Sequence, residues 1–461
     1  MKHIDESKIN ALLKIEAKKD EIDKILEKTK QLKRLTLEES AKLLAVQDNE
    51  LLKKIYAAAA YVKNTIYGKR VVLFVPLYIS NLCSNSCAYC GFAADNKHTV
   101  RKHLTCAQIK EQAEILLKRG HKRILMVSGE IADENKNIEY YVQAVKAIYS
   151  AEYQGNKIKR VNVNAAPLSV ESFKKLKNAG IGTYQIFQET YHDTTYRKLH
   201  ISGVKSDPDN RLDAIDRAFE AGIDDVGIGP LLGLYDHRFE ILALLMHIEY
   251  LEKKFGIGPH TISVPRIEPA PGSKYSSNPE YPLADEEFKK LVAVLRLSVP
   301  YTGIIMSTRE NAKLRDELVN LGVSQISAES KVTPGGYEEE SVHNDKLERQ
   351  FSVSDQRTLE EITGSLISQG LIPSFCAACY RKNRTGERFM DLAKPGAIKH
   401  MCDINALITL KEYLEDFAKP AIKEAGNKLI ESYKKNLDQE SLKLLEQFFK
   451  NIDNGIRDEY L

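Results

Sequence analysis

Hydrophobic and polar residues follow three successive patterns along this chain. Residues 1–69 carry apolar side chains at helical spacing, as where Leu43, Leu44 and Val46 follow the sequence Thr36-Leu37-Glu38-Glu39. That Thr-x-x-Glu sequence is a capping box, in which side chains accept hydrogen bonds from the free N–H groups at a helix start. We therefore expect an N-terminal helical collar.

From residue 70 onward, short β-rich runs alternate with amphipathic segments such as 106–119, 170–179 and 285–295. The first of these segments opens with a second capping box, at Thr105. Eight alternating units over about 260 residues are typical of an α/β fold of the TIM type, a complete (β/α)8 barrel. A doubly wound open sheet shows the same alternation and stays open as an alternative. The expected strands are 71–78, 123–128, 160–164, 183–188, 224–229, 262–266, 303–307 and 324–327.

The third pattern begins after Gly335-Gly336, where the polar stretch 337–350 predicts a linker. Helical patterns follow it and continue as charged amphipathic segments through the last residues of the sequence. We therefore expect three parts: an N-terminal helical collar at 1–69, a barrel at 70–340, and a mainly helical C-terminal cluster-binding extension at 341–461.

Composition and charge narrow the class of protein. The 67 Lys and Arg residues nearly balance the 64 Asp and Glu residues, for a formal net charge of +3. This balance gives no support to a nucleic-acid partner. The longest apolar run, near residues 71–78, is far shorter than a membrane span, and the N-terminal residues mix charges of both signs. We expect a cytoplasmic protein that has neither a nucleic-acid nor a membrane partner.

Six of the seven cysteines form two groups of three, and the seventh, Cys106, stands alone at an expected helix start. A disulfide framework is disfavoured because the count is odd and the chain is large. A lone cysteine at such a position is usually a small buried apolar side chain. Metal binding is therefore the better interpretation of the two groups, which are Cys83, Cys87 and Cys90, and Cys376, Cys379 and Cys402.

The first group has the spacing C-x3-C-x2-C and directly follows the first expected strand. Three thiolates at this spacing can bind a [4Fe–4S] cluster and leave its fourth iron open to another ligand. In a barrel, the loop after a strand lies at the C-terminal mouth, where active sites are built. The alternative is a structural zinc site completed by His98 or His103.

The second group has the spacing C-x2-C-x22-C, and it also offers three thiolates. A zinc site completed by His400 is again the alternative. Between the second and third of these cysteines, residues 380–401 carry more Lys and Arg than Asp and Glu. Such a basic loop would offset the negative charge of a thiolate-bound cluster, although a solvated face or a docking patch for a partner explains it equally well.

The C-x3-C-x2-C spacing, with Tyr89 before the last cysteine, resembles the signature of the radical S-adenosylmethionine (SAM) superfamily. The resemblance implies that the open iron chelates SAM and that one electron then cleaves SAM to a 5′-deoxyadenosyl radical, which abstracts hydrogen from substrate. Each residue has an ordinary alternative as a solvated charge or a turn glycine. The positions that resemble SAM contacts are Tyr89, Ser128, Gly129, Glu130, Glu189, Arg211 and Gly227, with Ser128 replacing the first glycine of a Gly-Gly-Glu segment.

Nearly the whole chain resembles one family within this superfamily, the tyrosine lyases of [FeFe]-hydrogenase maturation. The resemblance includes the segments FQETYH, DDVGIG, HTISVPR and STRE and the C-x2-C-x22-C tail. The 2-iminoacetate synthases of thiamine biosynthesis look similar through the barrel but lack that tail motif. The tail therefore discriminates between the two families.

The resemblance implies cleavage of the Cα–Cβ bond of L-tyrosine to p-cresol and dehydroglycine, followed by formation of CO and cyanide on iron. It implies two [4Fe–4S] clusters, the second with an additional iron held by a non-protein amino-acid ligand and one histidine. His260 precedes the sixth expected strand and so belongs at the opposite mouth from the first cluster, which makes it the expected ligand. Hydrogenase maturation proteins and a low-potential ferredoxin or flavodoxin are the implied partners.

For the substrate, Arg309 is expected to bind the tyrosine carboxylate in a bidentate manner, with help from Ser307. A surface arginine paired with Glu310 is the alternative, and Glu268 is a further acid of unassigned role. Three other functions remain open: a tyrosine lyase that stops at dehydroglycine, as in 2-iminoacetate synthases; an iron–sulfur carrier without radical chemistry; and a zinc-stabilised structural protein. The acids Glu130 and Glu189 argue against the carrier.

Overall fold

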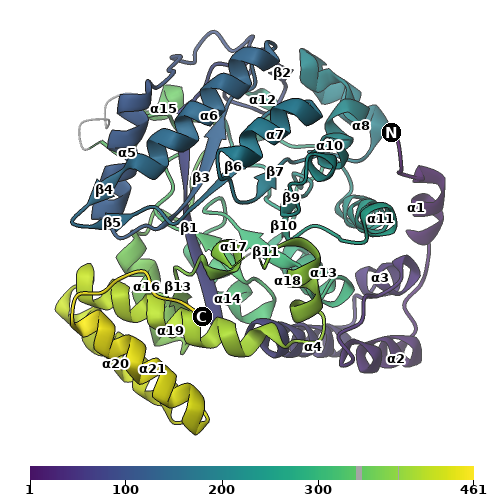
Figure 1. Cartoon of the computed structure of the whole chain (residues 1–461). Coiled ribbons are helices and arrows are strands. Elements are labelled where there is room, and N and C mark those ends of the chain that lie inside the picture. Colours follow the sequence, from purple (N-terminus) through teal and green to yellow (C-terminus); the bar gives the residue numbers. More distant parts are fainter. Residues whose placement is uncertain (339–344, 383) are drawn as a thin grey trace.

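Eight parallel strands form a closed barrel in the computed structural model of this protein, which describes residues 1–338, 345–382 and 384–461 (Figure 1). The last strand pairs back to the first, with Leu73 opposite Ile326. The sheet is therefore a barrel and not an open doubly wound sheet. Its strands in spatial order are β1 (Arg70–Ser80), β3 (Arg123–Ser128), β6 (Arg160–Asn164), β7 (Tyr184–Gln185), β9 (Val226–Ile228), β10 (Thr261–Ser263), β11 (Gly303–Met306) and β12 (Gln325–Ser327).

All eight expected strands are confirmed, with differences of a few residues at their ends. The three expected amphipathic segments are also helices, and the Thr105 side chain accepts a hydrogen bond from the Gln108 N–H as the capping box predicts. The helices between the strands are α5 (Cys106–Lys118), α6 (Glu134–Ser150), α7 (Val170–Asn178), α8 (Asp193–Leu199), α9 (Pro208–Leu212), α10 (Ala214–Glu220), α11 (His237–Phe255), α12 (Lys274–Ser277), α13 (Asp285–Ser298) and α14 (Ala312–Leu321).

The N-terminal residues form four helices, α1 (Glu6–Leu12), α2 (Lys19–Thr29), α3 (Leu37–Leu44) and α4 (Asn49–Tyr67). The capping box at Thr36 is present at the start of α3. Helix α4 packs on α13 and α14, while α1 and α3 pack on α11. These helices therefore lie against the outer helices of the barrel (Figure 1).

The C-terminal residues add one strand and several helices. Strand β13 (Ile372–Ser374) pairs in parallel with the first residues of β1, with Arg70 opposite Ile372. Buried apolar side chains from Ile4 to Ile452 form one continuous cluster. The helices are α15 (Asp345–Glu348), α16 (Leu359–Ser368), α17 (Ala378–Arg381), α18 (Gly386–Ala393), α19 (Ile398–Asp416), α20 (Pro420–Lys434) and α21 (Gln439–Asp453).

The expected domain boundary at residues 340–341 lies outside the described residues, as does part of the expected linker 337–350. The division into three parts therefore stays a prediction. Small elements complete the fold: β2 (Ser86–Cys87) pairs with β8 (His200–Ser202), β4 (Glu152–Tyr153) pairs with β5 (Asn156–Lys157), and η1 spans Val204–Ser206.

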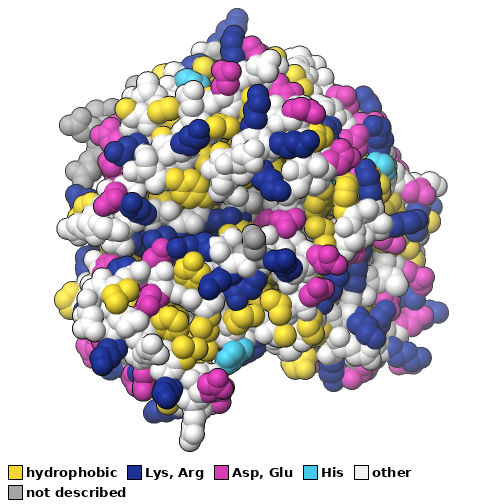
Figure 2. Space-filling model, viewed as in Figure 1, with side chains coloured by type: hydrophobic (Ala, Val, Ile, Leu, Met, Phe, Trp, Pro, Cys, Tyr) yellow, Lys and Arg dark blue, Asp and Glu magenta, His cyan; other side chains and the backbone are white. Residues whose placement is uncertain are grey.

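Charged side chains of both signs cover the face shown in Figure 2, and Lys and Arg side chains gather across its middle, between the upper barrel helices and the C-terminal helices. Arg381 and Lys382, in the basic segment after Cys379, are both exposed. In the three described ranges, no helix combines the length and apolar character needed to cross a membrane.

A buried ion pair joins the segment after β12 to the barrel. The Arg315 guanidinium on α14 donates to the Asp355 carboxylate and to the carbonyl of Ser327, and both charged side chains are fully buried. Arg357 adds a bond to Asp355 at 2.7 Å. Removal of one partner from such a pair leaves the other charge buried without compensation.

We expect Asp355→Ala to lower the free energy of unfolding by about 3–5 kcal/mol, because Arg315 then stays buried without its anion. The measurement is the urea midpoint of the metal-free protein. Glu317→Ala, which removes the partner of Lys289 on the surface of the same helix, is the matched control and should cost less than about 1 kcal/mol. Equal shifts for the two variants would contradict the role given to the buried pair.

Candidate functional site

The two cysteine groups lie at opposite mouths of the barrel. Cys83, Cys87 and Cys90 follow the C-terminal end of β1 and line a large cavity there. The other three line a second cavity together with Arg70 and Gly303, which begin strands β1 and β11. The chain therefore offers two separate cavities, each with three thiols.

The first cavity contains about 1340 Å³ of space unfilled by atoms, part of it open to solvent. Nearly all the residues that the sequence predicts to contact SAM or substrate line this cavity. The predicted residues that line it are Cys83, Cys87, Tyr89, Cys90, Ser128, Gly129, Glu130, Glu189, Arg211, Ser307 and Arg309, together with Glu268.

Burial raises the pKa of the Cys90 thiol to about 11, with a further contribution from the neighbouring Cys83. Burial also raises the pKa of Cys87. These thiols favour their protonated forms until a metal displaces the protons. Three thiols that line one cavity are the donor set that a [4Fe–4S] cluster with one open iron requires.

The zinc alternative at the first cavity lacks its fourth ligand. His98 is exposed, whereas the His103 Nδ1 bonds the Ser80 hydroxyl at 3.0 Å and its ring stacks on Tyr140. Neither histidine lines the cavity.

Two acids and two cations form a buried cluster in the first cavity. Arg211 Nη1 bonds Glu130 Oε1 at 3.0 Å, and Arg211 Nη2 lies 3.6 Å from Glu189 Oε1. Lys205 Nζ donates to Glu189 Oε1 at 2.5 Å. Sequence reasoning missed Lys205, because nothing in its spacing distinguishes it from a surface lysine.

The cluster keeps both carboxylates charged. Burial opposes ionisation of Glu130 and Glu189, but Arg211 and Lys205 outweigh it and lower the pKa of both acids. An amino-acid moiety carries one ammonium and one carboxylate, so it can pair with an acid and a cation of this cluster without adding net charge. The cluster thus fits the methionine end of SAM.

Tyr89 is held by a histidine that the sequence did not indicate. The His200 Nδ1 lies 2.8 Å from the carbonyl of Tyr196, which can only accept, so Nδ1 carries the proton. The Tyr89 hydroxyl therefore donates to His200 Nε2, at 2.9 Å. Burial lowers the pKa of His200, which keeps the ring neutral and suited to this role.

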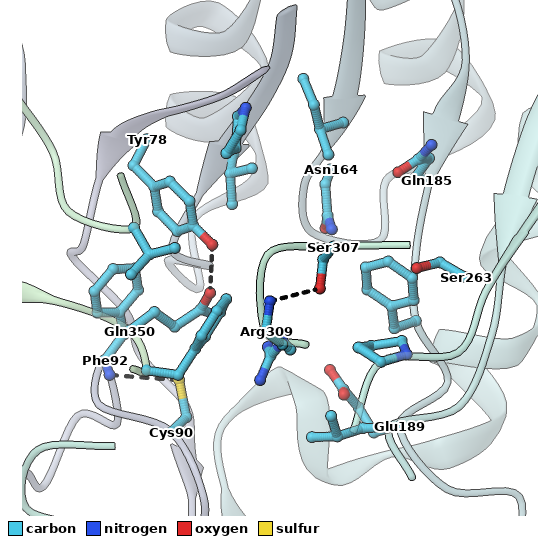
Figure 3. Close-up of a pocket in the computed structure, with 18 of the residues that line it drawn as sticks. Tyr78, Cys90, Phe92, Asn164, Gln185, Glu189, Ser263, Ser307, Arg309 and Gln350 are labelled. Carbon is cyan, nitrogen blue, oxygen red and sulfur yellow. Dashed lines mark hydrogen bonds between the residues drawn. The ribbon is translucent and has the colours of Figure 1, made fainter. Parts of the chain in front are cut away.

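Arg309, which the sequence predicts to bind the substrate carboxylate, also lines the first cavity (Figure 3). Its guanidinium lies 3.3 Å from the centre of the Phe351 ring, and its backbone N–H donates to the Ser307 hydroxyl at 3.4 Å. The alternative of a surface pair with Glu310 is wrong, because the buried Glu310 carboxylate bonds Arg266 instead. Within the described residues the Arg309 guanidinium has no carboxylate partner, so it can bind one from a ligand.

Gly227 lies apart from the other predicted SAM contacts. It is in the barrel interior below the first cavity, where a Cβ would lie 2.6 Å from Thr261 Oγ1 and 2.7 Å from Gln185 Cγ. Close packing between β7 and β10 accounts for a glycine there without a ligand. Its contact with SAM stays a prediction.

The second cavity contains about 550 Å³ and lies at the N-terminal mouth. His260, which precedes β10, lines it together with Cys376, Cys379 and Cys402. The His260 Nδ1 is buried and has no hydrogen-bond partner among the residues that the structure describes, and burial lowers the pKa of the ring. A neutral imidazole beside three thiols can ligate iron.

Buried cations surround this second group of thiols. Burial raises the pKa of Cys379 to about 12, while Arg70 favours its ionised form. Arg70 and Arg123 line the cavity, and within the described ranges each has a buried Nε without a hydrogen-bond partner. Unpaired buried donors of this kind are costly, so the cavity suits an anionic thiolate-bound cluster.

The zinc alternative at the second cavity is not supported. His400 precedes Cys402 by two residues on α19, so the two side chains point to different faces of the helix. His400 is exposed, and its Nε2 lies 3.3 Å from the Ser441 hydroxyl. Cys106 lines neither cavity and has its Sγ 3.8 Å from Gln143 Oε1.

Known proteins resemble this chain in sequence and in fold. Residues 77–246 match the family model of the Radical SAM superfamily, and residues 263–372 match that of the Biotin and Thiamin Synthesis associated domain. The 2-iminoacetate synthase of Salmonella typhimurium is 32% identical over 72% of this chain and 84% of the relative.

Two solved structures match over almost the entire chain. The crystal structure of HydG, a maturase of the [FeFe]-hydrogenase, is 46% identical, covers 100% of both chains and gives a TM-score of 0.95. The HydG maturase from Carboxydothermus hydrogenoformans is 43% identical over 93% of this chain and 94% of its own, with a TM-score of 0.82. The cysteine-lined barrel mouth, the family model and these full-length similarities agree: the chain belongs to the radical SAM superfamily and, within it, to the family of the HydG maturases.

Proposed function

We propose that this chain is a radical SAM tyrosine lyase of [FeFe]-hydrogenase maturation. It cleaves the Cα–Cβ bond of L-tyrosine to p-cresol and dehydroglycine, and CO and cyanide are then formed on iron at the second site. The observation that carries this proposal is the pair of thiol-lined cavities at opposite mouths of one barrel, with His260 in the second. A lyase that stops at dehydroglycine has no need of that second cavity.

The residues of the first cavity have separate tasks in this proposal. Cys83, Cys87 and Cys90 hold the first [4Fe–4S] cluster. Glu130 receives the SAM ammonium and Arg211 its carboxylate, while Tyr89, Ser128, Gly129, Glu189 and Gly227 complete the SAM contacts. When bound, SAM and the reduced cluster supply hydrogen-atom abstraction by a 5′-deoxyadenosyl radical.

Arg309 and Ser307 hold the tyrosine carboxylate in the same cavity. The Phe351 ring supports this assignment, because it lies against one face of the Arg309 guanidinium and leaves the N–H edge free for a bidentate contact. Glu268 also lines the cavity, and burial raises the pKa of its carboxyl.

At the second cavity, Cys376, Cys379 and Cys402 hold another [4Fe–4S] cluster, and His260 holds an additional iron. Hydrogenase maturation proteins receive the product, and a low-potential ferredoxin or flavodoxin supplies electrons. An iron–sulfur carrier is the non-enzyme alternative. The paired charges of Glu130, Glu189 and Arg211 favour a SAM site over a carrier, because cluster transfer has no use for them.

We expect Cys376→Ala/Cys379→Ala to keep p-cresol formation and to lose CO and cyanide, because the two cavities are separate and only the second is altered. The measurement is a product assay on the anaerobically reconstituted protein with tyrosine, SAM and a reductant. Cys106→Ala, which removes a thiol that lines neither cavity, is the matched control. Undiminished CO from the double variant would reduce the proposal to a lyase that stops at dehydroglycine.

We expect His260→Ala to bind roughly one iron fewer per chain than the unaltered protein, since it lacks the imidazole for the additional iron. Both [4Fe–4S] clusters and p-cresol formation should persist, whereas CO formation should be lost. Iron analysis and EPR spectra of the reduced protein measure this. An unchanged iron content would show that His260 is not a ligand.

We expect Arg309→Leu to lower kcat/KM for p-cresol formation by about 10–100-fold, because a charge-assisted bond to the substrate carboxylate is lost. The SAM titration of the first cluster should stay unchanged. Arg197→Leu, which removes an exposed arginine paired with Asp193, is the control. A parallel loss of SAM binding would place Arg309 at SAM and not at tyrosine.

A further inference from the structure

The backbone at Glu189 has a strained conformation. Its φ is +71°, in the left-handed region that side chains other than glycine rarely adopt. The Thr190 N–H donates to the carbonyl of Gln188 at 3.0 Å, which closes a three-residue γ-turn around Glu189. Such a turn persists only where the surrounding structure holds it.

Backbone hydrogen bonds to residues that follow strand β9 fix the first two residues of this γ-turn. The Gln188 N–H donates to the Gly229 carbonyl at 3.1 Å, and the Leu231 N–H donates to the Glu189 carbonyl at 2.7 Å. Both bonds tie the turn to the segment that follows β9. They fix the backbone up to Glu189 but not the two residues after it.

Glu240, on the first turns of α11, holds the other side. Its Oε2 accepts the Tyr191 N–H at 2.9 Å, and its Oε1 accepts the Thr190 hydroxyl. The His192 N–H lies 3.2 Å from Thr190 Oγ1 and donates to it, which directs the hydroxyl proton to Glu240. Both carboxyl oxygens therefore bind the residues that leave the γ-turn.

Glu240 is an unusual group for this position. Its side chain is 0% exposed, and over the described ranges no Lys, Arg or His forms an ion pair with it. A buried acid without a cation costs stability, and an apolar side chain would pack on α11 without that cost. The two hydrogen bonds that the Glu240 carboxyl accepts are the interactions that offset this cost.

We infer that Glu240 is a positioning residue for SAM binding: it braces the γ-turn so that the Glu189 carboxylate meets Lys205 and Arg211. This inference rests on the proposed function for the assignment of SAM to the first cavity. The chain of contacts is continuous, because Arg211 also bonds Glu130 at 3.0 Å. Loss of the brace therefore misplaces the acid and loosens the cations that bind the methionine end of SAM.

The test is a SAM titration of the reconstituted full-length protein, followed through the EPR signal of its first reduced cluster. Glu240→Ala should raise the SAM midpoint about tenfold, the effect of about 1.4 kcal/mol. Glu240→Gln should stay within about threefold, because its carbonyl oxygen can accept the Tyr191 N–H while its amide donates to the Thr190 hydroxyl. Thr190→Val should fall between the two.

Glu249→Ala is the matched control, since it removes an exposed acid from the same helix. It should bind SAM as the unaltered protein does. Unaltered midpoints for both Glu240→Ala and Thr190→Val would overturn the inference, as would equal losses for Glu240→Ala and Glu240→Gln. If Glu240→Ala does not fold, Thr190→Val decides, because it removes the hydrogen bond to Glu240 and the one from the His192 N–H while it keeps the shape of the side chain.

A second readout needs neither cluster nor SAM. Burial raises the pKa of Glu240 to about 8, and Asp236 and Glu6 raise it further, while the bonds from Thr190 and Tyr191 lower it. In the unfolded chain the pKa of a glutamate is about 4.3. The folded protein therefore binds a proton more tightly. The resulting stability is complete below about pH 4, declines as the pH rises, and is lost by about pH 8.

The thermal midpoint of the metal-free protein should thus fall, relative to that of Glu240→Gln, between about pH 4.5 and pH 8, and the difference should change little above pH 8. The histidines on this side of the barrel do not imitate the effect, because burial lowers the pKa of His192 and lowers that of His247 to about 4. A pH-independent difference would show that Glu240 is not held in the turn and would overturn the inference. A protein without any SAM response, but with this pH dependence, would refute the proposed function and leave the brace in place.

Discussion

The hydrogen-bonded pairing of strand β1 is the constraint on which the rest of this structure depends. Its middle residues close the barrel against β12 on one side and β3 on the other, and its first residues hold β13. Arg70 at its start lines the second cavity, and Ser80 at its end leads into the loop of Cys83. Both thiol groups and the closure of the sheet therefore rest on one buried run of backbone.

The two cavities treat buried charge in opposite ways. In the first, two acids and two cations neutralise one another, namely Glu130, Glu189, Lys205 and Arg211. A zwitterionic ligand can therefore pair with one acid and one cation without changing the net charge of the cavity. In the second, Arg70 and Arg123 each have a buried donor with no partner among the described residues, next to thiols whose pKa is raised by burial. The second cavity therefore suits an anionic group.

Much of the fold and of both sites could be predicted from the sequence, because strand ends and cysteine spacing are local signals. The eight strands, the capping boxes and the placement of His260 at the mouth opposite Cys83 all followed from such signals. Lys205, His200 and Glu240 could not be found in this way, because their roles depend on tertiary contacts. Lys205 lines the first cavity, whereas His200 bonds Tyr89 and Glu240 bonds the residues after Glu189. Gly227 was assigned to SAM because its segment resembles the glycine-containing fifth strand of the superfamily, and this contact stays a prediction; the structure shows that Gly227 fills a tight position inside the barrel.

The continuity of β1 also limits how this chain can vary. Successive side chains of a strand point to opposite faces, so an insertion of one residue in Arg70–Ser80 would turn every later side chain to the wrong face. A deletion of two residues would restore the faces but draw the two mouths together by about 7 Å. The loops around the barrel can change length independently. A change in the length of β1, by contrast, would alter the distance between the two thiol-lined cavities.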